Sequence, residues 1–375
     1  MRAPEQAPFL AVNSPEALGF IAEKRFATKH YENAGAVAQE SLARAPFNAR
    51  ALRVLGMVRA EDASRLSEAD QIVTLAGNWS LRDDPAHAWL IERRLKQGSF
   101  ASAFAHADTL ARRRDELQPG VFQLFTRAAT MDRRSLPYLA QRLALMPPWR
   151  GEYLAFLRKD PGGDAVMFYL ASNLAGKPGT FTRAELEILY KHWLGEGRIE
   201  AIRQVRRLTA PDATNTLVNG DFETDYAEQP LPFGWELGNG PGFSSQIVPD
   251  DLRPSQKALR VQVSGDRVNI AADQFLLLSP GAYQITGTYR VEHGELAANR
   301  AEWVLRCLET PAPQDVRLTR PLSGRTVWTS FAGTLRIPDR GCTGQHLQLV
   351  IRGAEYRSDL ALWIDKVRLS AVKGN

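Results

Sequence analysis

The stretch Gln204–Gly220, QVRRLTAPDATNTLVNG, is where the chain changes its structural period. Before it, apolar residues recur at helical spacing, as at Ala34, Val37 and Leu42. After it they alternate with period two, as at Leu259–Val263. The stretch therefore predicts an all-α half followed by an all-β half, joined by a short linker.

Charge divides at the same point of the 375-residue chain. Residues 1–211 carry 30 Lys and Arg against 23 Asp and Glu, whereas residues 212–375 carry 17 against 19. Turn residues punctuate the second half at short intervals, for example at Asn219-Gly220 and Pro280-Gly281. We predict a helical domain over 1–211 and an antiparallel β-sandwich of the jelly-roll type over 212–375.

The segment Ser41–Val58, SLARAPFNARALRVLGMV, resembles the junction between two tetratricopeptide repeats. Pro46 ends one helix and Asn48 begins the next. The resemblance extends over about a third of the chain and places small residues where paired helices cross; they are Ala22, Ala34, Ser41, Gly56, Ala103 and Ala107. It implies a solenoid that docks a protein partner. An irregular helical bundle without a partner is the alternative.

Two clusters of arginine give the helical half its positive charge. They comprise Arg112, Arg113, Arg114, Arg203, Arg206 and Arg207. We consider them as a basic docking surface for an acidic protein or polysaccharide, with an ordinary solvated face as the alternative. No sequence motif of a nucleic-acid-binding fold accompanies them, so no nucleic-acid partner is expected.

The two ends of the β half carry its most specific motifs. Leu217–Glu223, LVNGDFE, opens it, Phe233–Trp235 follows, and Leu362–Leu369, LWIDKVRL, closes it. Together they resemble the carbohydrate-binding modules of the galactose-binding-like superfold. The resemblance covers residues 212–372 and implies that the first and last strands lie side by side and that the domain binds polysaccharide.

Modules of this kind bind sugars with exposed aromatic rings, so the resemblance suggests a set of candidates. The rings are Trp303, Tyr283, Tyr289, Phe243 and Tyr356. A place in the core is the alternative for each of them. We assign Trp235, Trp328 and Trp363 to the core.

The same resemblance implies a structural calcium ion held by Asp221, Glu223 and Asp365, because such modules often bind one. Asp365 shares parity with Trp363 and Val367, which predicts an inward-facing carboxylate. Lys366 departs from the pattern, since the family commonly has a second acid there. The alternative is that Asp365 caps backbone amides without metal, and no cofactor is required.

Cys307 and Cys342 are the two cysteines, 35 positions apart in the β half. A disulfide between them would indicate a periplasmic or cell-envelope protein, with a signal or anchor missing from this chain. Two buried free thiols, which are common in cytoplasmic proteins, are the alternative. No apolar stretch is long enough to span a membrane.

The six histidines show no metal-ligand spacing, and the sequence contains no nucleophile elbow, phosphate-binding loop or dinucleotide fingerprint. We therefore expect a non-enzymatic envelope protein. Its helical half would dock a protein, such as glycan assembly or export machinery, and its β half would bind polysaccharide in exopolysaccharide biosynthesis or export. The alternatives are a pure protein scaffold and a glycan-modifying enzyme with an unrecognised site.

Overall fold

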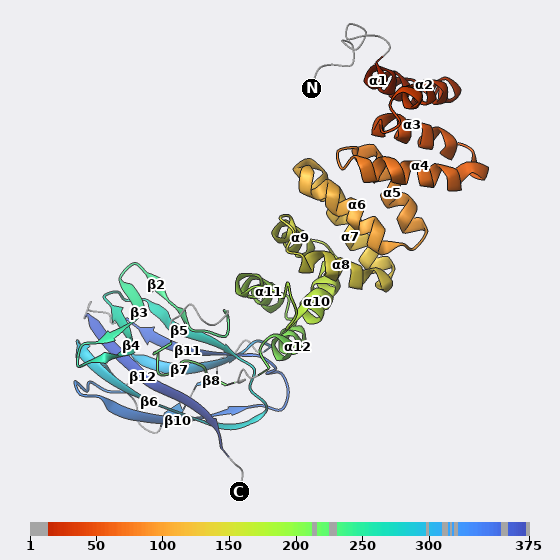
Figure 1. The fold of residues 1–375 in the computed structure, drawn as a ribbon. Helices are drawn as coiled ribbons and strands as arrows, with labels where there is room; N and C mark the ends of the chain where they lie inside the picture. The colour runs from red at the N-terminus through yellow and green to blue at the C-terminus, as the bar shows by residue number, and fades with distance from the viewer. Residues whose placement is uncertain are drawn as a thin grey trace. The chain divides into compact units, whose positions relative to one another are not determined.

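The computed structural model describes residues 14–211, 216–224, 231–297, 300–309, 314–315, 317–318, 322–353 and 359–372. They form two compact units, residues 1–180 and 181–375, which we describe separately (Figure 1). The change from helix to strand falls where the sequence predicts it. The second unit, however, also contains the last two helices, so helix and sandwich pack together within it.

The first unit consists of helices joined by short turns. They are α1 (Pro15–Ala27), α2 (Tyr31–Arg44), α3 (Ala49–Ala60), α4 (Leu66–Trp79), α5 (Asp84–Lys96), α6 (Phe100–Arg113), α7 (Gln118–Met131), α8 (Leu136–Ala144), α9 (Arg150–Leu157) and α10 (Gly163–Leu174). Single 3-10 turns precede three of them, at Ala63–Arg65, Asp115–Leu117 and Arg133–Ser135. Consecutive helices pair as α1–α2, α3–α4 and α5–α6 (Figure 1).

Helix starts and crossings follow from local chemistry. Ser14 caps α1 by accepting a hydrogen bond from the Ala17 amide, and Asn48 caps α3 through the Ala51 amide. The Asn48 side chain also donates to the Pro15 carbonyl and to Ser41 Oγ, which ties α1, α2 and α3 together. The small residues predicted for close crossings are buried; fully so are Ala22, Ala34, Ser41, Ala103 and Ala107. These hairpins have the expected packing, while their membership of the tetratricopeptide family stays a prediction.

The second unit begins with α11 (Arg183–Gly195) and α12 (Ile199–Thr209) and continues into two antiparallel sheets. Among the described residues the first sheet has the order β1-β5-β11-β7-β8, with bounds Glu236–Leu237, Val268–Leu276, Gln345–Arg352, Ala301–Cys307 and Gln314–Asp315. The second has the order β2-β3-β4-β12-β6-β10-β9, with bounds Asn239–Gly240, Phe243–Asp250, Arg253–Val263, Leu360–Ala371, Gly281–His293, Thr329–Ile337 and Arg317–Leu318. Alternate residues of both sheets face one shared core, as expected for a sandwich.

No helix within the described ranges is both long enough and apolar enough to cross a membrane.

Gly56 lets α3 approach α4 closely. A Cβ built there would lie 2.5 Å from Val73 Cγ2 and 3.3 Å from the Ala69 carbonyl oxygen. We expect Gly56→Ala to destabilise the protein by about 1–3 kcal/mol, because the helices must separate. The matched control is Gly120→Ala in α7, where a Cβ meets nothing within 4 Å. It should raise stability by about 0.5–1 kcal/mol through helix propensity. Thermal unfolding of both variants measures this, and equal effects would contradict it.

A histidine pair between α5 and α6 should make the helical unit sensitive to acid. His87 Nδ1 and His106 Nδ1 are 2.9 Å apart in one hydrogen bond. Burial lowers the pKa of both imidazoles, and that of His106 falls to about 4 through burial and then through the charge of His87. The unfolded chain, with histidine pKa values near 6.5, therefore binds more protons, so stability falls as pH drops from about 6.5 towards 4.

Melting temperatures at pH 7 and pH 5 test this expectation. His106→Gln should reduce the drop between the two pH values, whereas His30→Gln, at an exposed residue of the same unit, should leave the drop unchanged. An unaltered drop in His106→Gln would exclude the pair as its source.

Candidate functional site

The outer face of the seven-stranded sheet carries many polar side chains, and β12 and β6 pair there with two β-bulges. On β12, Asp365 pairs with Thr288 of β6 while Arg368 pairs with Thr286, so β12 has one extra residue. Lys366 sits in this bulge with φ 54°, the left-handed region. As a result, Asp365, Lys366 and Arg368 lie on the outer side, while Ile364 and Val367 face the core.

This bulge corrects the predicted parity of the last strand. Trp363 and Asp365 do not share a face with Val367 and Leu369, because the extra residue reverses the alternation between them. Asp365 is 1% exposed, but it is covered from outside the sheet by Arg253. Trp363 is likewise buried beneath outer-face side chains rather than within the core cluster.

The opening motif of the domain holds the bulge in place. The Val367 amide donates to the Gly220 carbonyl at 2.7 Å, and a Cβ on Gly220 would lie 1.9 Å from the Val367 carbonyl oxygen. Asn219, at φ 49°, exchanges two hydrogen bonds with the backbone of Thr224 and accepts one from the Trp235 indole. The two ends of the domain are therefore side by side, as the sequence motifs predict.

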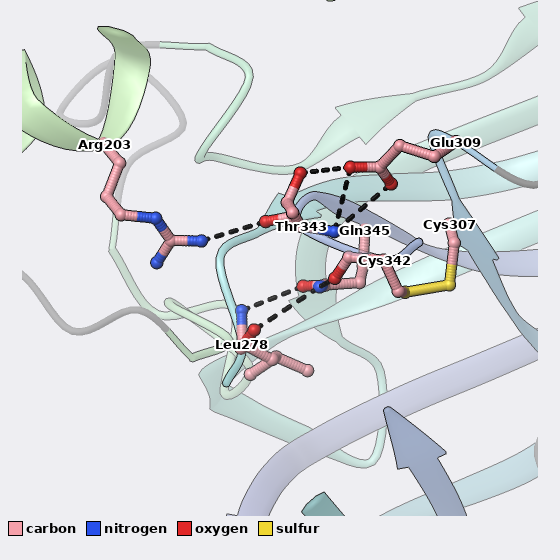
Figure 2. Close-up of a disulfide and its surroundings, with 7 residues drawn as sticks. All are labelled: Arg203, Leu278, Cys307, Glu309, Cys342, Thr343 and Gln345. Atoms are coloured by element: carbon pink, nitrogen blue, oxygen red, sulfur yellow. Dashed lines mark hydrogen bonds between the residues drawn. A yellow bond between two sulfur atoms is a disulfide. The ribbon is translucent and has the colours of Figure 1, made fainter. Parts of the chain in front are cut away.

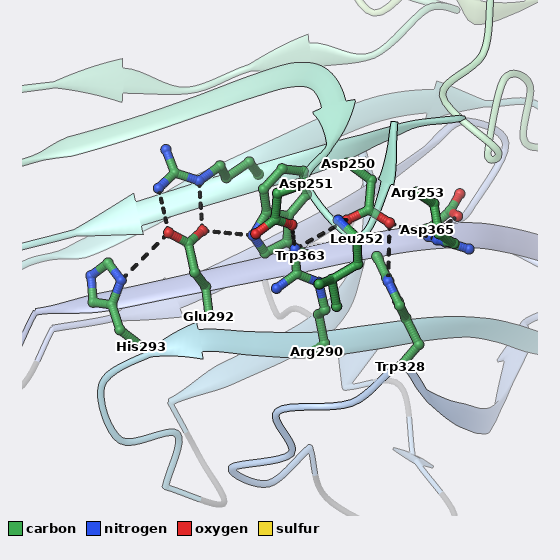
Figure 3. A network of polar contacts seen from close by, with 11 residues as sticks. Asp250, Asp251, Leu252, Arg253, Arg290, Glu292, His293, Trp328, Trp363 and Asp365 are labelled. Atoms are coloured by element: carbon green, nitrogen blue, oxygen red, sulfur yellow. Dashed lines mark hydrogen bonds and ion pairs between the residues drawn. The ribbon is translucent and has the colours of Figure 1, made fainter. Parts of the chain in front are cut away.

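An ion-pair network centred on Asp250 covers part of the outer face (Figure 3). Asp250 is fully buried and accepts from Arg253 Nε at 2.6 Å, Arg290 Nη2 at 3.0 Å and Trp328 Nε1 at 3.1 Å. Burial alone raises the pKa of Asp250, but its hydrogen bonds, that from Arg253 foremost, lower the pKa overall. Asp365 differs: burial raises its pKa despite the Lys366 amide and Arg253.

A second group adjoins this network. Glu292 accepts from both Arg260 Nε and Nη2 at 2.8 Å and from Trp363 Nε1 at 2.7 Å, and the Arg260 hydrogen bonds lower its pKa to about 2. The Arg290 guanidinium lies 4.7 Å from the centre of the Trp363 ring. Arginine stabilises Asp250 and Glu292 as anions, an arrangement that orders side chains on the sheet.

A pocket of about 760 Å³ opens on this face, over β6, β10 and the bulge of β12. Its lining combines hydroxyl, cationic and aromatic residues, namely Thr286, Gly287, Thr288, Tyr289, Ser323, Arg325, Thr329, Ser330, Phe331, Ala332, Lys366 and Arg368. Among the residues that the structure describes, no carboxylate belongs to this lining. The volume is in the range of small-ligand sites.

Four of the five aromatic rings predicted to bind sugar are buried in the sandwich core. Trp303, Tyr283, Tyr289 and Phe243 are 1–8% exposed and belong to the sandwich core, because each lies at an inward position of its strand. They are not exposed platforms, although Tyr289 contributes to the pocket wall. Tyr356 lies outside the described residues. Trp235 is a core residue as predicted, whereas Trp328 is half-buried on the outer side, stacked by Arg253 at 4.1 Å.

The predicted calcium ligands are not brought together. Asp365 faces Arg253, and Glu223 accepts a hydrogen bond from the Lys257 amide. Asp221 is exposed. Across the described part of the chain, no group of three or more His, Cys, Asp or Glu could hold a metal ion. The Lys366 amide donates to Asp365 Oδ1 at 2.6 Å, so this carboxylate caps a backbone amide.

The two arginine clusters form intramolecular contacts. Arg112 pairs with Asp108, and both Arg113 and Arg114 pair with Asp84.

In α12, Arg203 donates to the carbonyls of Leu277 and Thr343, and the Arg206 guanidinium stacks 3.4 Å from the centre of the Phe233 ring. Burial lowers the pKa of Arg206 to about 10. These two side chains attach α12 to the sandwich, so the basic face predicted for them is a packing surface. Arg207 alone of the three is exposed.

The predicted disulfide between Cys307 and Cys342 is present, with 4.8 Å between the two Cα atoms (Figure 2). Thr343, next to Cys342, accepts from Arg203 at 2.9 Å and donates its amide to Glu309 at 3.0 Å. The disulfide therefore fixes the loop on which α12 rests. A disulfide is consistent with an extracytoplasmic protein.

Over 41–43% of its length, the chain is similar to solved structures of carbohydrate-binding modules. No protein-family model and no curated protein matches the chain. Among solved structures, the CBM22-1 xylan-binding domain from Paenibacillus barcinonensis Xyn10C is similar at 10% identity, with 43% of this chain and 96% of that one covered and a TM-score of 0.32. TmCBM61 in complex with β-1,4-galactotriose is similar at 14% identity, 43% and 100% coverage and a TM-score of 0.29. Family 16 Carbohydrate Binding Module-2 is similar at 18% identity, 41% and 98% coverage and a TM-score of 0.29.

Sequence reasoning missed the pocket because its residues come from three strands and a loop. The nearest signal was Lys366 itself, an unexpected lysine between an aspartate and a valine. Its place in a bulge depends on contact with Gly220, which no local pattern records.

Asp250→Asn should destabilise the protein by about 3–5 kcal/mol, because it leaves the buried Arg290 without its buried carboxylate partner. The neighbouring Asp251→Asn is the matched control. Asp251 also pairs with Arg290, but its side chain is 55% exposed, so its loss should cost about 1 kcal/mol or less. Chemical denaturation measures both values, and a similar cost for the two would show that the network does not depend on Asp250.

Proposed function

We propose that this protein is a non-catalytic polysaccharide-binding protein of the extracytoplasmic space, and that the pocket on the outer face of the seven-stranded sheet binds the glycan. The observation that carries the proposal is the lining of this pocket. It places hydroxyl groups of Thr286, Thr288 and Ser330 beside guanidinium and ammonium groups over an open sheet surface. Sugars carry several hydroxyl groups on each ring, and these can form hydrogen bonds with hydroxyl side chains and with guanidinium and ammonium groups.

A binding role suits the carboxylates of this face better than catalysis. Hydrolysis of a glycosidic bond uses two carboxyl groups, one of which can donate a proton. Asp250 and Glu292 have lowered pKa values and accept from arginine and tryptophan, so neither is placed to serve as that acid. Neither of them lines the pocket, and neither does Asp365, whose pKa is raised by burial.

The helical unit would dock a protein partner. Phe47 and Trp79 pack against each other with ring centres 4.3 Å apart, yet they are 72% and 43% exposed, and Leu81 is 60% exposed. An exposed aromatic cluster is typical of a protein-interaction surface. A chain that joins such a surface to a glycan-binding unit would serve in exopolysaccharide biosynthesis or export, by bringing the polymer to assembly machinery. The Cys307–Cys342 disulfide supports a periplasmic or cell-envelope location for this process.

A glycan-binding assay on the full chain tests the proposal, with Ser330→Tyr as the variant. Ser330 is exposed on the outer side of β10, so a tyrosine there should fill the pocket and abolish binding by steric exclusion.

Thr334→Tyr is the control, because Thr334 is exposed on the same side of the same strand but does not line the pocket. It should retain the affinity of the unmodified protein. Binding by Ser330→Tyr as strong as that by Thr334→Tyr would place the glycan elsewhere. Failure of the unmodified chain to bind any glycan would favour the pure scaffold.

A further inference from the structure

The pocket on the outer face has an unbalanced positive charge. Arg325, Lys366 and Arg368 line it, and none of the described residues that line it is acidic. The charge balance of residues 212–375 does not explain this, because they carry 19 acidic against 17 basic side chains. Three positive charges therefore line one pocket in a β half whose net charge is slightly negative.

The three cations also differ from the half-buried and buried arginines of the same sheet face. Arg253, Arg260 and Arg290 each form ion pairs with carboxylates of this face. Over the described ranges, Arg325, Lys366 and Arg368 take part in no ion pair, and all three are exposed. Exposed cations that line a concave surface attract an anionic group from solution.

The backbone at Lys366 is a second, independent observation. Its φ of 54° lies in a region that glycine or asparagine adopts more readily than lysine. The bulge held by Gly220 imposes this conformation, and it places an ammonium group beside the pocket where regular alternation would bury it in the core. Unfavourable backbone conformations of this kind are common at binding sites.

From these observations we infer that the pocket is specific for a glycan that carries carboxylate groups, such as a uronic-acid polymer. This inference rests on the proposed function and names its substrate class. A carboxylate would bind the guanidinium of Arg325 or Arg368, whose two parallel N–H groups match its two oxygens, and Lys366 would add a third charge. The hydroxyls of Thr286 and Ser330 would bind the sugar ring.

The test compares each glycan with its own uncharged form. Oligosaccharides of polygalacturonate, alginate and hyaluronate are titrated into the full chain by calorimetry, each as the free acid and as the carboxyl methyl ester. At least one free acid should bind, and its ester should bind about tenfold or more weakly, since esterification removes the charge but keeps the ring hydroxyls. Binding of the free acid should also weaken with added salt.

Variants then locate the charge recognition. Lys366→Asn removes the ammonium group with a residue that tolerates the left-handed conformation, and Arg368→Gln removes a guanidinium; each should weaken binding of the free acid about tenfold and leave the ester unaffected. Arg336→Gln is the control, because Arg336 is exposed on the same face of β10 but does not line the pocket. Unchanged melting temperatures confirm that the variants fold.

The outcomes separate this inference from the proposed function. Equal binding of acid and ester, or binding of neutral xylan or galactan alone, would overturn the inference and leave the proposed function standing. Tighter binding of dextran sulfate than of every carboxylate polymer, lost in Lys366→Asn, would replace carboxylate by sulfate as the recognised group. If neither charged nor neutral glycans bind, the proposed function fails as well.

Discussion

The contact between Gly220 and Val367 is the constraint on which the β unit depends. The glycine carbonyl accepts from the Val367 amide, and the absence of a side chain lets the two backbones meet. This contact fixes the bulge at Lys366 and so decides which residues of the last strand face the core. Ile364 before the bulge and Val367 after it are both buried in the core, while the residues between them reach the outer face.

A second β-bulge lies on the neighbouring strand, β6. Between Val291 and His293, β6 has one extra residue opposite β12, and Glu292 and His293 carry adjacent polar groups there. Glu292, which faces outward like Arg290, contacts Arg260 and Trp363. The outer face therefore has a region of paired charges around Asp250 and Glu292 and a region of exposed cations at the pocket. The first region orders the sheet surface and the second is open to a ligand.

The attachment of α11 and α12 to the sandwich gives arginine a different role from the one that sequence suggests. From the sequence, a cationic helix beside a linker is predicted to be exposed to solvent, because the residues that pack against it cannot be identified. In the fold, Arg203 and Arg206 reach carbonyl oxygens and an aromatic ring of the sandwich, and the loop that receives Arg203 is fixed by the disulfide. The long side chains span this contact because their stems pack against apolar surface while their head groups bond.

The sequence by itself determined the division into helical and β halves, the close crossings at Ala22, Ala34 and Gly56, and the meeting of the two motifs at the ends of the β half; it left open whether Cys307 and Cys342 form a disulfide. These follow from periodicity, residue size and resemblance, all of which are carried by local patterns. Only the tertiary structure decided which aromatic rings are buried, that Asp365 pairs with arginine, and that Lys366 lines a pocket. The reason is that the side of the sheet on which a side chain lies alternates along a strand. One extra residue, held in place by a glycine distant in sequence, reverses this alternation for the residues that follow.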